Sequence, residues 1–131
     1  ESILELFHGP TSAFKDFALQ LLPYLLTASA KKQGINDKIA ILVATSGDTG
    51  KAALEGFADV DGTGICVFYP YGGTSEIQRL QMTTQQGKNV LVTAVKGNFD
   101  DVSPGSRRYL PTRPTPMSLK RWESVSPPPT P

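Results

Sequence analysis

Three short apolar runs divide the first hundred residues, and they constrain the fold more than any other feature. They cover residues 39–44, 65–69 and 90–95, each long enough for one buried strand. Helical patterns at 49–58 and from Ser75 to about Gln86 separate them, so neighbouring strands cannot form tight hairpins. Strand, helix, strand, helix, strand with short links predicts an open parallel α/β sheet with flanking helices and right-handed crossovers. The first run is expected to be covered on both faces.

The two helices between the runs carry their own signals. Ala52, Ala53 and Phe57 are expected to face inward from the first. The second opens with a capping box, Ser75-Glu76-Ile77-Gln78, and Gly87 is expected to close it.

An amphipathic helix is predicted before the first strand. Ser12 or Thr11 can cap its start, and Pro23 predicts a bend or a second helical piece that reaches about Lys32. Gly34 then supplies the stop. A broad apolar stripe with helical spacing is made by Phe14, Phe17, Ala18, Leu21, Leu22 and Leu25.

Lys15 is the first candidate for chemistry, at the start of this helix. A lysine with apolar neighbours can have its ammonium desolvated, which favours the neutral amine that forms a Schiff base. The alternative is a solvated surface lysine at a helix start. Beside it, Asp16 is expected to be an ion-pair or first-turn residue, and His8 a packed or hydrogen-bonded loop histidine.

A second motif, Thr45-Ser46-Gly47-Asp48-Thr49-Gly50, follows the first apolar run. It would lie at the carboxyl end of a strand and the amino end of a helix, where ligands gather in open α/β sheets. Unpaired N–H groups and the helix dipole favour an anion there, and the glycines allow close backbone approach. The alternative is ordinary helix capping by Ser, Asp and Thr.

Together the two motifs resemble threonine synthase, a pyridoxal-phosphate enzyme of the tryptophan-synthase-β-like fold. The resemblance is carried by the stretch from Glu5 to Asp16 and by Thr45 to Gly50, in that order and spacing. It extends over about residues 1–101 and implies a partial small domain of that fold.

The resemblance also implies roles for five residues. Lys15 would hold pyridoxal phosphate covalently and, once freed, move protons, while Asp48 would lie near the cofactor ring hydroxyl. The substrate α-carboxylate would be bound by Ser46, Gly47 and Thr49. The implied reaction converts O-phospho-L-homoserine and water into L-threonine and phosphate.

Two alternatives stay open. One is another pyridoxal-phosphate lyase of the same fold, a phospholyase or a serine/threonine dehydratase, although Asp48 favours threonine synthase over the dehydratases. The other is a non-catalytic truncated product. Gly97-Asn98-Phe99-Asp100 is similar to a phosphate-binding loop of fold relatives, but it follows the third strand and is not assigned to phosphate. Without a phosphate-loop candidate, the isolated chain is expected to be inactive.

The composition changes after Asp101. Eight of the 11 prolines fall in residues 104–131, so 102–131 is predicted to be a disordered Pro-rich tail outside the resemblance. This departure suggests an altered reading frame or an artificial end. Residues 1–101 carry 8 Lys+Arg against 11 Asp+Glu, a net charge of −3, and the remainder carries +4. A mildly acidic body argues against nucleic acid as a partner.

The remaining expectations concern metal, membrane and location. One histidine and one cysteine, Cys66, give no metal-ligand set, and Cys66 is expected as a small apolar residue in a buried strand. A single cysteine fits a reducing compartment such as the cytoplasm. No apolar run reaches the ~18–20 residues that span a bilayer. An exposed apolar face is expected, covered by a missing large domain or by self-association.

Overall fold

The structure is a computed structural model, and it describes residues 1–97. Its centre is one parallel sheet of β1 (Ile39–Ala44), β2 (Thr63–Pro70) and β3 (Val90–Val95), in the order β1-β2-β3. The register places Leu42 opposite Cys66, and Cys66 opposite Leu91. The three strands and their parallel arrangement confirm the sequence prediction.

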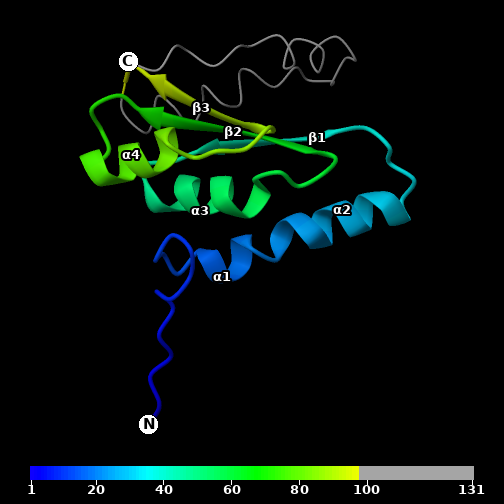
Figure 1. The fold of residues 1–131 in the computed structure, drawn as a ribbon, viewed down its shortest axis with the longest axis horizontal. Coiled ribbons are helices and arrows are strands. Elements are labelled where there is room, and N and C mark those ends of the chain that lie inside the picture. Colours follow the sequence, from blue (N-terminus) through cyan, green and yellow to red (C-terminus); the bar gives the residue numbers. More distant parts are fainter. Residues whose placement is uncertain (98–131) are drawn as a thin grey trace.

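Two helices connect the strands: α3 (Asp48–Phe57) joins β1 to β2, and α4 (Glu76–Thr83) joins β2 to β3. Both lie against the same face of the sheet (Figure 1). The expected inward residues of α3 are indeed buried. The main core lies between these helices and the sheet and consists of Ala53, Leu54, Phe57, Ile65, Val67, Tyr69 and Met82.

Helix α4 starts as predicted but ends earlier. Ser75 is its N-cap, and the capping box with Gln78 is complete. The helix stops at Thr83 instead of reaching about Gln86. The hydroxyls of Thr83 and Thr84 donate to the Arg79 and Leu80 carbonyls, so side chains occupy carbonyls at the helix end.

The expectation that residues 39–44 are covered on both faces is wrong for the part of the chain that the structure describes. No residue of β1 is fully buried. The reason is its position, because β1 is an edge strand and the described helices lie on one face only. The central strand β2 is the buried one, with six of its eight residues inaccessible, and Cys66 lies in it as expected.

The predicted first helix is two helices, α1 (Asp16–Leu19) and α2 (Leu22–Lys32). Pro23 lies in the first turn of α2, where its missing N–H costs no helical bond. The second piece ends at Lys32 as predicted, and Gly34 follows in the left-handed region with φ +71°. Capping by Ser12 or Thr11 is wrong, because α1 has Lys15 as N-cap without a side-chain hydrogen bond.

The apolar stripe of the first helices does not face the body of the protein. Phe17 is 79% exposed and Leu21 57%, and the other stripe residues are exposed as well. The side chains that pack toward the core from α1 and α2 are Leu19 and Leu26 instead. The pattern correctly identifies an amphipathic helix, but the described residues contain nothing that covers its apolar side.

Several predictions fall outside the described residues. These are the Pro-rich tail at 102–131 and three of the four residues of the Gly97–Asp100 motif. Within residues 1–97, no helix is long and apolar enough to cross a membrane.

Candidate functional site

Lys15 lies immediately before α1 and is partly buried. Its ammonium nitrogen is 4.8 Å from the centroid of the Phe14 ring. No carboxylate within residues 1–97 forms an ion pair with it. The amine is therefore next to an apolar ring and is not held by a counter-ion in the described part of the chain.

Asp16 fixes the turn that leads to Lys15. It is 2% exposed, and its carboxylate accepts hydrogen bonds from the Thr11 N–H at 2.8 Å and from the Thr11 hydroxyl at 2.6 Å. A Cβ at Gly9 would overlap the Asp16 side chain, so the turn closes tightly around this carboxylate. Asp16 is thus the expected first-turn residue, and its role is to hold the backbone before the candidate lysine.

Thr45 holds the second motif together through the hydrogen bonds of its hydroxyl group. Its side chain is buried, and its hydroxyl oxygen accepts hydrogen bonds from the N–H groups of Gly47 and Gly50, both at 3.0 Å. The same hydroxyl lies 3.2 Å from the Gly47 carbonyl and donates to it. The N–H of Gly47 is therefore used inside the loop, and Thr45 is a structural residue that sequence reasoning did not single out.

The start of α3 presents free hydrogen-bond donors next to the buried Thr45 side chain. Ser46, Asp48 and Thr49 are exposed, and their backbone N–H groups have no acceptor within residues 1–97. The hydroxyls of Ser46 and Thr49 are equally without a hydrogen-bond partner there. Free N–H groups in the first turn of a helix attract an anion. The start of α3 thus exposes three of the candidate residues with unpaired donors, as a site for an anion would require.

The Asp48 side chain is hydrogen-bonded to a residue of α4. Its carboxylate oxygen Oδ1 accepts a hydrogen bond from the Gln78 side-chain amide at 2.7 Å. A Cβ at Gly47 would overlap the same amide, so glycine is needed there to admit Gln78. Sequence reasoning recognised Gln78 only as a helix-capping residue. Its contact with Asp48, across 30 positions, carries no local sequence signal.

Both motifs are attached to α3. Helix α1 packs against α3 where the Leu19 carbonyl lies over Gly56, and a Cβ at Gly56 would overlap it. The two helices run in the same direction, with their starts toward the edge where the strands end (Figure 1). Lys15 directly precedes α1, and the Ser46–Thr49 loop contains the start of α3. The two packed helices therefore begin near the same edge of the sheet, where the strands end.

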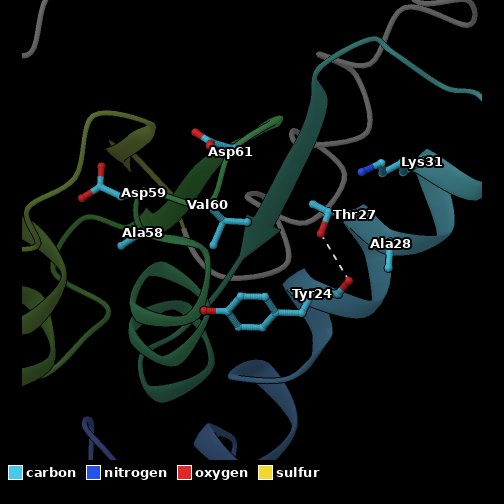
Figure 2. Close-up of a pocket in the computed structure, with 8 residues that line it drawn as sticks. All are labelled: Tyr24, Thr27, Ala28, Lys31, Ala58, Asp59, Val60 and Asp61. Carbon is cyan, nitrogen blue, oxygen red and sulfur yellow. Dashed lines mark hydrogen bonds between the residues drawn. The ribbon is translucent and has the colours of Figure 1, made fainter.

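Two other features lie apart from this site. His8 is exposed, and its Nε2 lies 2.7 Å from Glu5 Oε2, as expected of a hydrogen-bonded loop histidine. An open hollow lies between α2 and the segment before β2, with Tyr24 and Lys31 on one side and Asp59 and Asp61 on the other (Figure 2). It is at the amino ends of the strands, whereas ligands of such sheets bind at the carboxyl ends.

No family model matches the chain. Over 101 residues it is 54% identical to the threonine synthase of Pseudomonas aeruginosa, which covers 77% of this chain and 21% of that protein. The threonine synthase of Saccharomyces cerevisiae is 46% identical over 105 residues, covering 76% and 20%. Among solved structures, PLP-bound threonine synthase from Brucella melitensis matches with a TM-score of 0.74 and 43% identity, covering 81% of this chain and 22% of that one.

These similarities define the class of the molecule as a partial α/β domain with the fold of the solved threonine synthases. Over about three quarters of its length, the chain is a homologue of threonine synthase. It spans about one fifth of the length of the curated relatives that it matches.

Proposed function

We propose that residues 1–101 are part of a threonine synthase, which uses pyridoxal phosphate to convert O-phospho-L-homoserine and water into L-threonine and phosphate. The observation that carries the proposal is the 54% identity over 101 residues to a threonine synthase. A solved relative is described as PLP-bound, which supports the cofactor.

Lys15 is the proposed point of attachment for the cofactor and the group that moves protons. Bound pyridoxal phosphate withdraws electrons from the substrate and so makes its α-proton acidic. The Lys15 amine fits the task because it is partly buried beside Phe14 and has no ion-pair partner in the described residues. Asp16 fixes the backbone turn that leads to Lys15 through its hydrogen bonds with Thr11.

The start of α3 is the proposed site for the substrate α-carboxylate. Ser46 and Thr49 each offer a free N–H and a hydroxyl, both of which donate to an anion. Gly47 contributes by lacking a side chain, since its own N–H bonds to Thr45. Asp48 is proposed to face the ring hydroxyl of the cofactor with the carboxylate oxygen that Gln78 leaves free.

The 131-residue chain alone is proposed to be inactive. It contains about one fifth of the length of its relatives, and no phosphate-binding loop can be assigned within it. The stripe through Phe17 and Leu21 is proposed as the surface that the large domain of a threonine synthase covers. We place the protein in the cytoplasm, because its single cysteine is buried and unpaired.

Borohydride reduction of the chain with pyridoxal phosphate, followed by peptide mapping, tests the assignment of Lys15. The label should fall on Lys15 and disappear in Lys15→Arg, because arginine stays protonated and cannot react. Lys31→Arg, at an exposed lysine of α2, is the matched control and should keep the label. A label on Lys31 or Lys51 instead would contradict the assignment.

The same experiment separates the non-catalytic alternative from the two enzymatic ones. A non-catalytic truncated product would show no absorbance band from bound cofactor and no specific label. Another lyase of the fold would keep the Lys15 label but would, in a complete enzyme, act on a different amino acid. Threonine formation by the isolated chain would contradict the proposed inactivity.

A further inference from the structure

Gln78 connects the starts of the two helices on the sheet. It is the third residue of α4, and its Oε1 accepts hydrogen bonds from the Ser75 hydroxyl at 3.0 Å and from the Ser75 N–H at 3.4 Å. Its Nε2 donates to Asp48 Oδ1, at the start of α3, at 2.7 Å. One carboxamide therefore caps its own helix and binds the candidate loop.

The chemistry of the partners determines the orientation of this carboxamide. The Ser75 N–H can only donate, so it requires the amide oxygen, and an ionised Asp48 carboxylate can only accept, so it requires the amide nitrogen. A flipped amide would lose both hydrogen bonds and place its oxygen against the carboxylate. The amide also occupies the space that a side chain at Gly47 would need.

We propose that Gln78 is a positioning residue of the candidate site, which holds the Asp48 carboxylate through Oδ1 and leaves Oδ2 for the ligand. The contact also ties the segment before α4 to the Ser46–Thr49 loop. The proposal rests on the proposed function for the identity of the ligand, and on the hydrogen bonds of Gln78 to Ser75 and Asp48 for the geometry.

Side-chain amide resonances of the 15N-labelled chain test the contact directly. The Gln78 amide signal should shift with pH as Asp48 is protonated, and the shift should vanish in Asp48→Asn. Gln81, on the same helix and without a side-chain hydrogen bond in the described residues, is the matched control and should not shift. Glu76 is the carboxylate in the first turn of α4, and Glu76→Gln should leave the pH-dependent shift of Gln78 intact. A pH-independent Gln78 amide, or one that still titrates in Asp48→Asn, overturns the proposal.

Gln78→Glu is the sharpest variant, because it keeps the shape of the side chain and places a carboxylate against Asp48. Facing carboxylates repel, and this exceeds the gain from a charge at the helix start, so the unfolding equilibrium constant at pH 7 should rise about threefold over wild type. The loss should shrink as the pH falls, since protonating one carboxylate removes the repulsion. Gln81→Glu should show neither effect. An equal loss in Gln81→Glu, or a loss that does not change with pH, overturns the proposal.

Titration with pyridoxal phosphate then separates the positioning role from a purely structural one. If Gln78 acts through Asp48, Gln78→Leu and Asp48→Ala should change the cofactor absorbance band in the same way, and the double variant should add nothing. Additive changes, or an unchanged band in Gln78→Leu, overturn the positioning role. A wild-type chain without any band counts against the proposed function, and the amide titration then decides the Gln78 proposal.

Discussion

Asn89 illustrates how one side chain can hold several backbone segments together. Its Nδ2 lies 2.9 Å from the Phe57 carbonyl, and its Oδ1 accepts from the Asp59 N–H at 2.7 Å. Nδ2 also lies within 3.4 Å of the carbonyls of Val60 and Thr63. The amide thus joins the end of α3, the start of β2 and the start of β3.

Removing that amide should be costly. Asn89→Ala leaves the Asp59 N–H without its acceptor and removes the donor shared by the Phe57, Val60 and Thr63 carbonyls, so we expect a loss of about 1–2 kcal/mol in the free energy of unfolding. Chemical denaturation followed by circular dichroism measures it. Lys88→Ala is the neighbouring control and should stay within about 0.5 kcal/mol, because only the Lys88 backbone N–H is bonded, to Asp59. Equal losses in both variants would refute this role of Asn89.

The buried thiol of Cys66 should make the stability of the protein fall at alkaline pH. Burial in β2 raises the pKa of its thiol from 9.0 to about 11, and the Thr93 side chain offsets this slightly by hydrogen bonding. Because the unfolded thiol ionises at lower pH, the unfolded state binds fewer protons between about pH 9 and 11. Stability should therefore fall with rising pH in that window, by up to roughly 2–3 kcal/mol. Comparing wild type with Cys66→Ala isolates the effect, and parallel pH profiles would contradict it.

At the level of elements, Gly56 shows packing overriding helix propensity. Alanine at Gly56, the second-last residue of α3, would gain at most about 1 kcal/mol of propensity over glycine. Here the added Cβ would overlap the backbone carbonyl of Leu19, which cannot move without displacing α1. We expect Gly56→Ala to destabilise the protein and to weaken hydrogen-exchange protection in α1 first. Ser29→Ala, at an exposed position of α2, should be neutral or slightly stabilising. A stabilised Gly56→Ala variant with unchanged exchange would be inconsistent with this packing.

The elements that the sequence predicts well are those governed by local chemistry. The runs at 39–44 and 90–95 are the exact strands of the structure, and the Ser75–Gln78 capping box is present. Predictions failed where a side-chain hydrogen bond, local or distant, decides the outcome. Asp16 takes the Thr11 hydroxyl that was expected to cap the helix, and Thr83 ends α4 early. The Gln78–Asp48 contact could not be predicted either, because neither side chain reveals its partner through periodicity.

At the level of the whole molecule, an apolar pattern identifies a buried surface but not what buries it. The period of Phe14, Phe17 and Leu21 marks a stripe, but it does not distinguish this sheet from another surface as its cover. In the structure, α1 meets α3 through Leu19 and Gly56 instead, and the stripe stays exposed. The segment that matches the relatives is only about one fifth of their length, so the same pattern can serve a surface that this sheet does not provide.

The exposed stripe predicts that the isolated chain self-associates. A contiguous apolar face promotes association, whereas single exposed apolar residues do not. Replacing Phe17 and Leu21 together by serine should weaken association about tenfold or more, since each removes a side chain worth about 1.5–3 kcal/mol when buried. Sedimentation velocity across a concentration series measures it, and the thermal melt should be unchanged because both residues are exposed. Ile77→Ser removes a similarly exposed residue on α4 and is the control. A wild-type chain that stays monomeric at every concentration, or an equal effect of Ile77→Ser, would rule out the stripe as the associating surface.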